Sequence, residues 1–199
     1  MTMASETEGR NPRSVKTRDA IADALLDLLG AGHLRPTAKE IADQAGVSVR
    51  SVYVHFDDLE DLFCVAATRH YARIAPSLER VAADGALAER ARALVDRRVR
   101  LYTNIGDVGR ATRLQAPFSP TLARIVRDSH ARSTRELRRL FAPEIAGLDD
   151  ARQASLLAML EVVTSATTWE MLLEVHHLNA EAAAGMVAAT VVALFEDEA

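Results

Sequence analysis

The chain has 199 residues, 49% of them hydrophobic and 5% aromatic, and its formal net charge is −4. Its length and apolar content are enough for one core or two small ones. No apolar run approaches the roughly 20 residues that span a bilayer, and the first ten residues lack a secretory signal. We therefore expect a soluble, cytoplasmic protein with no membrane partner. Abundant Ala, Leu and Arg predict an all-α fold, and the helical segments predicted along the chain number about nine.

Residues 1–13 are polar and contain Pro12, which predicts a disordered tail. Arg10 and Arg13 leave a second interpretation open, a basic arm that contacts a partner. A helix is predicted from Ser14 onward and stops at the glycines that follow residue 29. Its apolar residues recur at helical spacing: Ile21, Ala24, Leu25, Leu28 and Leu29.

Residues 37–56 predict two short helices joined by one tight turn. Thr37 can cap the first helix, and Glu40 three residues later completes a capping box. Gly46 breaks that helix, and Ser48 can cap the next one. Two helices and one turn in this length form a helix-turn-helix. An ordinary helical hairpin with a polar outer face is the alternative.

The outer face of the second helix carries hydroxyl, guanidinium, phenol and imidazole groups, which reach phosphates and base edges of DNA. Charge supports this interpretation, since residues 10–56 sum to +2 and the rest of the chain to −6. A basic segment on an acidic body suits a DNA-binding protein whose other domain stays off the DNA. The residues predicted to contact DNA are Lys39, Ser48, Val49, Arg50, Ser51, Tyr53 and His55.

The run IADQAGVSVRSVYVHFDDLEDLF resembles the DNA-binding signature of the TetR family of bacterial transcriptional regulators. Arg50 stands where the family often has Gly or another variable residue, which adds a long donor. Leu59 stands where the family usually has a Lys that holds a phosphate. The acids around it can instead serve the start of the next helix, with Asp58 as its cap. The matching residues are Ile41, Ala42, Ala45, Gly46, Val47, Ser48, Tyr53, His55, Phe56 and Leu62.

After the signature, the pattern predicts helices from about residue 59 to 74, from 87 to 105, and a short one between Gly106 and Pro117. Residues 119–141 form an arginine-rich helix. Its arginines are interpreted as a solvated face, with the alternative that one turns inward to meet an anionic effector. His130 on this helix is interpreted as a satisfied polar group, with ligand binding as the alternative.

Two long helices close the chain, from about residue 149 to 176 and from 179 to 195. Small residues let helix axes approach closely, and such a pair can form a four-helix bundle with a second copy. The TetR resemblance implies this dimer. The predicted dimer residues are Leu156, Leu160, Val163, Thr167, Ala182, Gly185, Met186, Ala189 and Ala193.

The resemblance divides the chain into a tail (1–13), a helix-turn-helix domain (14–57) and a ligand-binding and dimerisation domain (58–199). Aromatic and Met side chains in the last domain can line an effector pocket, although such residues are more often core. The candidates are Tyr71, Tyr102, Phe118, Leu122, Met159 and Trp169.

No catalytic motif, cofactor motif or metal-ligand spacing is present, so the sequence does not indicate an enzyme, a cofactor or a metal site. The single cysteine, Cys64, is interpreted as a buried structural thiol and not as a redox sensor. The leading hypothesis is a homodimeric repressor that binds a palindromic operator in double-stranded DNA and is released by an unknown small molecule. The alternative is a helical adaptor with a degenerate DNA-binding head.

Overall fold

The computed structural model describes residues 12–77 and 79–196, and these residues form helices and no strand. The predicted all-α fold is confirmed. Residues 1–11 of the predicted tail lie outside the described residues. Pro12 and Arg13 were wrongly assigned to that tail, because they begin helix α1 (Pro12–Gly30). Proline suits the first position of a helix, where its fixed φ costs nothing and its missing N–H is not needed.

The chain forms two compact units. The first contains the chain up to Ala72 together with Asp107–Ser119, and the second contains Arg73–Gly106 and the chain from Pro120 onward. The boundary predicted between residues 57 and 58 divides the chain by role, and it stays a prediction.

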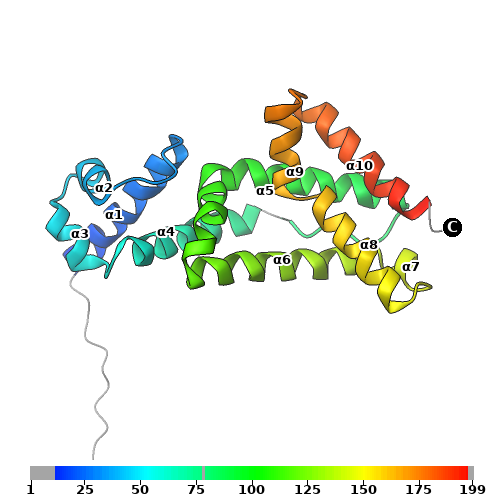
Figure 1. The fold of residues 1–199 in the computed structure, drawn as a ribbon, viewed down its shortest axis with the longest axis horizontal. Helices are drawn as coiled ribbons and strands as arrows, with labels where there is room; N and C mark the ends of the chain where they lie inside the picture. Colours follow the sequence, from blue (N-terminus) through cyan, green and yellow to red (C-terminus); the bar gives the residue numbers. More distant parts are fainter. Residues whose placement is uncertain (1–11, 78, 197–199) are drawn as a thin grey trace, which may run out of the picture. The chain divides into compact units, whose positions relative to one another are not determined.

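In the first unit, α1 packs with α2 (Ala38–Ala45) and α3 (Val49–His55), as Figure 1 shows in blue and cyan. Gly46 ends α2 in the left-handed conformation, at φ 66°, and its N–H donates to the carbonyl of Ala42. That conformation favours glycine, which has no Cβ to clash. Buried apolar side chains from the three helices, and from Phe56 directly after α3, form the core: Ile21, Leu25, Leu29, Ile41, Val52 and Phe56.

Helix α4 (Leu59–Ile74) follows after a short connection. The Asp58 carboxylate accepts from the N–H of Asp61 at 2.7 Å, so Asp58 caps α4 as predicted. Arg69 fastens α4 to α1 through an ion pair with Asp19 at 2.8 Å. The α-helix ends before Pro76, which lies in a 3₁₀ turn, Ala75–Ser77.

Helix α5 (Leu87–Gln115) corrects the prediction of two separate helices in this region. The break is a kink at Gly106, with φ 48° and ψ −139°, and helix resumes at once on the other side. Gly109 lies buried within the helix and does not interrupt it. Only glycine adopts the Gly106 conformation readily. A 3₁₀ turn, Ala116–Phe118, ends this segment.

The second unit continues with α6 (Pro120–Leu140) and α7 (Ala142–Ile145), followed by α8 (Asp150–Val163) and α9 (Ala166–Glu170). A π-helical turn, Met171–Val175, leads to α10 (Ala180–Glu196). The single helix predicted over residues 149–176 is therefore wrong. It breaks where the Ser165 hydroxyl accepts from the N–H of Thr168 and starts α9 as a new N-cap. Serine hydroxyls compete with helix continuity in this way.

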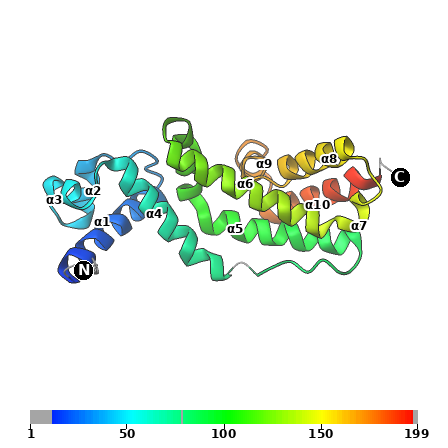
Figure 2. The same cartoon turned by 90° about the horizontal axis from the view of Figure 1, so that it is seen from below.

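Helices α6 and α10 both pack against α8, and Figure 2 shows α8 in yellow next to α10 in red. Their buried side chains form the core of the second unit. Phe141 and Phe195 meet there with ring centroids 5.1 Å apart. The other large members include Leu94, Leu137, Leu140, Leu156, Leu157 and Leu160.

The stretch Asp150–Val175 is long and apolar enough to cross a membrane by length and composition alone, and 28% of an apolar 18-residue window within it is buried. This single match is weak evidence for a membrane span. The stretch is also divided between α8, α9 and the π-helical turn. The exposed apolar side chains of this stretch therefore favour a contact surface over a membrane span.

Candidate nucleic-acid interface and core cavity

Helix α3 is anchored on one side and exposed on the other. Val52 is fully buried in the first unit, and Ser48 caps the helix by accepting from the N–H of Ser51 at 3.1 Å. The Ser48 and Ser51 hydroxyls also contact each other at 3.0 Å. Val49, Arg50 and Tyr53 are exposed, whereas Ser51 and His55 are half-buried. Val52 and the Ser48 cap therefore hold α3 in place, and its outer face stays exposed to solvent.

Arg18 of α1 fixes the end of α3. Its Nη1 donates to the carbonyl oxygen of His55 at 2.5 Å, and its guanidinium lies 4.3 Å from the centre of the Phe56 ring. A cation at a helix C-terminus interacts favourably with the partial negative charge there. The sequence alone did not indicate this residue, because its contact with His55 joins positions 37 residues apart and no local pattern signals it.

Helix α2 has the predicted capping box. The Thr37 hydroxyl accepts from the N–H of Glu40, and the Glu40 carboxylate accepts from the N–H of Thr37 at 2.7 Å. This backbone hydrogen bond, helped by the Thr37 hydroxyl, lowers the pKa of Glu40. Lys39 pairs with Asp43 at 2.8 Å, and the hydrogen bond to that carboxylate raises the pKa of Lys39. Exposed pairs of this kind are weak, so the ammonium can exchange Asp43 for a phosphate.

Leu59, which replaces the phosphate-holding Lys of the signature, faces a cavity of about 350 Å³ in the first unit. Apolar and polar side chains line it together, among them Leu25, Phe63 and Tyr53. Gln115 also reaches it and donates to the carbonyl of Leu34 at 3.3 Å. At this position, therefore, the chain packs its DNA-binding unit and offers no charge to a phosphate.

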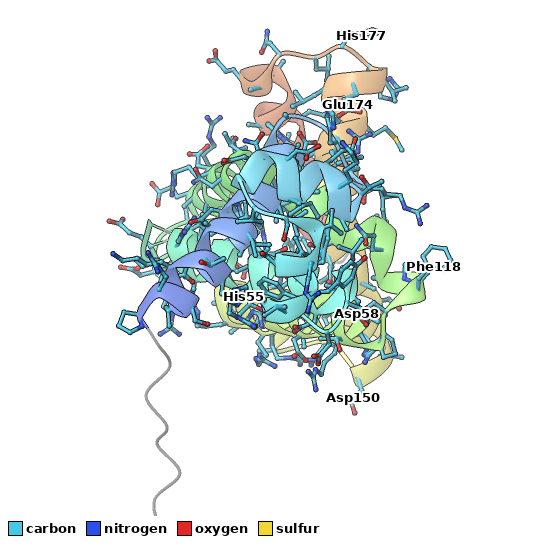
Figure 3. All side chains as sticks on the ribbon, turned by 90° about the vertical axis from the view of Figure 1, so that its left-hand side faces the viewer. His55, Asp58, Phe118, Asp150, Glu174 and His177 are labelled. Atoms are coloured by element: carbon cyan, nitrogen blue, oxygen red, sulfur yellow. The ribbon has the colours of Figure 1, made fainter. Side chains whose placement is uncertain are left out.

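Two of the four acids beside Leu59 have partners inside the first unit. Asp58 caps α4, and Glu60 accepts from the Ser119 hydroxyl at 2.5 Å. Figure 3 shows His55 and Asp58 at the connection between α3 and α4. Asp58 and Glu60 therefore stabilise the local structure, which gives these two acids a role that does not involve DNA.

Comparison with protein families supports the geometry of this unit. Residues 21–64 match the model described as bacterial regulatory proteins, tetR family. Residues 21–64 therefore form a DNA-binding domain of the TetR family. The family identified from the signature is thereby confirmed, and the match covers α1 from Ile21, α2, α3 and the start of α4.

Solved structures share the fold over nearly the whole chain. A transcriptional regulator from Rhodococcus sp. Rha1 is 20% identical with a TM-score of 0.70, covering 90% of this chain and 96% of that one. A TetR transcription regulator from Haloarcula marismortui is 18% identical with a TM-score of 0.65, covering 92% and 98%. The multidrug binding protein EbrR, complexed with imidazole, is 18% identical with a TM-score of 0.63, covering 96% and 97%. A comparison with curated proteins found no match.

Outside the TetR domain, the second unit encloses a small cavity of about 10 Å³ between α5, α8, α9 and α10. Two of the residues proposed for an effector pocket, Tyr102 and Trp169, line it. The Tyr102 hydroxyl donates to the carbonyl of Thr164 at 2.5 Å, at the break between α8 and α9. The other wall residues are Val95, Arg98, Val99, Val163, Ser165 and Val187.

The four remaining pocket candidates do not line this cavity. Tyr71 belongs to the first unit, and so does Phe118, which is 79% exposed and projects from the ribbon in Figure 3. Leu122 is buried in α6, and Met159 is 50% exposed on α8. Periodicity alone did not distinguish these positions from true lining residues.

The predicted dimer residues fall into two groups. Five residues of α10 are exposed: Ala182, Gly185, Met186, Ala189 and Ala193. On α8, Leu156 and Leu160 belong to the protomer's own core and are not available to a partner. Val163 is half-buried against that core, and Thr167 is exposed. The apolar side chains that α8 does expose are Met159 and Val162, so the side of α8 that is free for a partner is not the side that carries Leu156 and Leu160.

The arginines of α6 are mostly exposed, as their interpretation as a solvated face requires. His130 contacts the Glu161 carboxylate at 2.5 Å, which fits a satisfied polar group. Burial, together with the nearby acids Glu60 and Asp61, raises the pKa of the half-buried Cys64 thiol, and a raised pKa disfavours the reactive thiolate. The arginines that do turn inward are Arg90 and Arg98 of α5, a helix that sequence analysis did not consider for this role.

Proposed function

We propose that this regulator is a repressor. It binds a palindromic operator as a homodimer, and a small-molecule effector releases it. The observation that carries the proposal is α3, a capped helix with a buried anchor at Val52 and an exposed polar face. Helices of this kind enter the major groove of DNA, and a dimer would place two of them about one helical turn apart.

The proposed DNA contacts follow from exposure. Arg50 is exposed on α3 and suits a base edge, whereas Tyr53 and His55 suit phosphates. Val49 adds an exposed apolar contact. Ser48 and Ser51 keep their hydroxyls engaged with each other, so we assign them a supporting place beside Arg50. Lys39 contributes a phosphate contact from α2 by leaving Asp43.

The alternative, an adaptor whose head no longer binds DNA, rests on Leu59 and the acids around it. Asp58 and Glu60 have structural partners, which weakens that argument. Arg50 supplies a cation that the usual signature lacks. We therefore favour DNA binding over the adaptor.

The proposed dimer uses α8 and α10. The exposed face of α10 is made of small residues and Met186, and α8 adds Met159 and Val162 at 50% and 60% exposure. Large apolar side chains exposed on neighbouring helices favour an interaction site. Covering it with a second copy also accounts for the low burial of Asp150–Val175.

The proposed effector site is the cavity at Tyr102 and Trp169. An effector that binds better to the conformation with misplaced DNA-binding units shifts the population away from DNA in proportion to its differential affinity. EbrR, which shares the fold, is a multidrug binding protein complexed with imidazole, and this supports a ligand-binding role by analogy. We also propose a cytoplasmic, non-enzymatic protein, as regulators of this family generally are.

The test is a selection of bound sequences from a random DNA pool, followed by gel shifts of the selected site. We expect a palindrome, and an affinity that falls by roughly 10³-fold or more between about 50 and 200 mM salt. Arg92→Ala, at an exposed arginine of the second unit, serves as the control and should leave the affinity unchanged. Recovery of no palindrome at any salt concentration would support the adaptor and contradict the proposal.

A further inference from the structure

Helix α5 carries two buried arginines eight residues apart, Arg90 at 4% exposure and Arg98 at 8%. Arg90 uses all three of its guanidinium nitrogens. Its Nε donates to the carbonyl of Gly85, its Nη1 to that of Leu140, and Nη1 and Nη2 together hold the two oxygens of Glu144. Arg90 is therefore a satisfied structural residue.

Arg98 is different. Its Nη2 contacts the Ser133 hydroxyl at 2.8 Å and the Glu136 carboxylate at 3.3 Å. Its Nε is buried and has no hydrogen-bond partner among the residues that the structure describes. Buried donors in folded proteins nearly always have a partner, and each exception needs an explanation. A bound ligand that accepts this hydrogen bond is one.

The charges around Arg98 do not cancel. Arg97 also contacts Glu136, through the same oxygen, at 3.1 Å. Two guanidinium groups thus share one carboxylate, and all three side chains are at least four-fifths buried. The cluster keeps one excess positive charge in a region where water screens it poorly. A buried anion would neutralise it.

Arg98 also lines the cavity at Tyr102 and Trp169. The rest of that wall is mainly apolar, with four valines around the two aromatic rings. At about 10 Å³ the cavity has room for about one water molecule. Any larger ligand must push the wall outward. Behind that wall lies an irregular segment, the π-helical turn Met171–Val175, whose Leu172 and Leu173 pack against the cluster that contains Trp169.

We propose that Arg98 is the anchor for a compact apolar carboxylate, which opens this cavity and acts as the effector. The inference rests on the proposed ligand response and names its chemical class. The carboxylate accepts from Arg98 Nε and balances the charge shared by Arg97 and Glu136. Its apolar part lies against Trp169, Tyr102 and the valines. A neutral ligand would leave the excess charge in place, and a cation would add to it.

The test uses benzoate, phenylacetate and octanoate, each beside its primary amide, on the full-length protein. Trp169 is the only tryptophan of the chain, so its fluorescence reports binding at this cavity. We expect saturable changes with at least one carboxylate and about tenfold or more weaker binding of its amide. Arg98→Gln should remove this preference. The matched control is Arg92→Gln, on the same helix but 52% exposed and paired with Asp96.

Glu136→Gln keeps the test decisive if Arg98→Gln does not fold. It removes the competing carboxylate, so it should tighten binding of the same probe, and misfolding does not produce a gain. Equal binding of acids and amides, or no binding by any of the three carboxylates, overturns the inference. A gel shift on the selected operator separates the two proposals. If the operator still binds, only the effector class is wrong, whereas loss of both means that the proposed function fails.

Discussion

Two sets of contacts, the helix caps of the first unit and the buried polar contacts of the second, differ in how far apart in sequence their partners lie. In the first unit, the caps of α2, α3 and α4 each join residues three positions apart, at Thr37, Ser48 and Asp58. In the second unit, the polar contacts that fix the core join distant positions, with separations of 54 residues for Arg90 and Glu144 and 62 for Tyr102 and Thr164. The caps are therefore specified by local sequence, whereas the buried contacts of the second unit, like those of Arg18 and Arg69 in the first, depend on how the helices meet.

Substitutions in the two units should therefore have different effects, one on DNA binding and the other on folding stability. The exposed face of α3 has little packing to lose, so changes there should act on DNA and leave the fold intact. The buried polar groups of the second unit are embedded in packing, so changes there should act on the fold first. Four measurements test the contrast.

The largest effect is expected for Arg90→Met in the second unit. Removing one partner of a buried ion pair leaves the other uncompensated, here Glu144, which is 20% exposed, and costs about 3 to 5 kcal/mol. Urea unfolding of the purified protein measures this loss. Arg92→Met, at an exposed pair on the same helix, should change the free energy of unfolding by less than about 1 kcal/mol. Equal losses in both variants would mean that burial of Arg90 is not what matters.

Next in size is Arg50→Ala in the first unit. If Arg50 contacts a base, binding to the selected operator should weaken by about 1 to 3 kcal/mol, with relaxed preference at one position. Thermal unfolding should not change, because Arg50 is exposed. Gel shifts on a panel of single-base operator variants measure the effect. A uniform loss on every sequence would make Arg50 a phosphate contact.

Thr37→Ala tests the local contacts of the first unit directly. Loss of an N-cap hydroxyl costs about 1 kcal/mol, so the free energy of unfolding should fall by this amount. Thr37→Ser keeps the hydroxyl and should recover most of it. If alanine and serine behave alike, the capping box in this unit contributes nothing measurable.

Acid titration is expected to give the smallest effect. The hydrogen bond from Arg90 lowers the pKa of Glu144 below its ordinary value of 4.5. A lowered pKa in the folded state means that the pair stabilises the protein fully above the unfolded value, and that this stabilisation is lost as pH falls through the folded value. Unfolding curves should be measured at several pH values below about 5. The free energy of unfolding should fall more steeply with decreasing pH in the wild type than in Arg90→Met. Parallel curves would assign the acid sensitivity to other carboxylates, such as Glu40.

The range of the contacts also explains what the sequence predicted. The capping box, the Gly46 turn and the Asp58 cap were predictable because each signal lies within a few residues. Arg18 was not, because its place at the end of α3 depends on how α1 packs. Arg98 was missed for the same reason, and the inward arginine was sought on the wrong helix.

Helix phase limited the prediction of the second unit. Helix α8 is apolar on both sides, with Leu156 and Leu160 buried and Met159 and Val162 exposed. A spacing rule finds an apolar stripe on such a helix but does not tell which stripe faces the core. The break at Ser165 was missed because its hydroxyl cap lies inside an otherwise continuous helical pattern.

Because α8 and α10 expose apolar side chains, the concentration of this protein in the cell should affect how much of it stays folded and unaggregated. Under the proposed dimer, a protomer without a partner leaves Met159, Val162 and Met186 in water. The fraction of chains in that state rises as the protein is diluted, because dimer stability depends on protomer concentration. Solitary chains are also those most prone to aggregate. A regulator present at low copy number would then need a tight dimer. The expression level of the gene would set the fraction of chains that are paired and protected from aggregation.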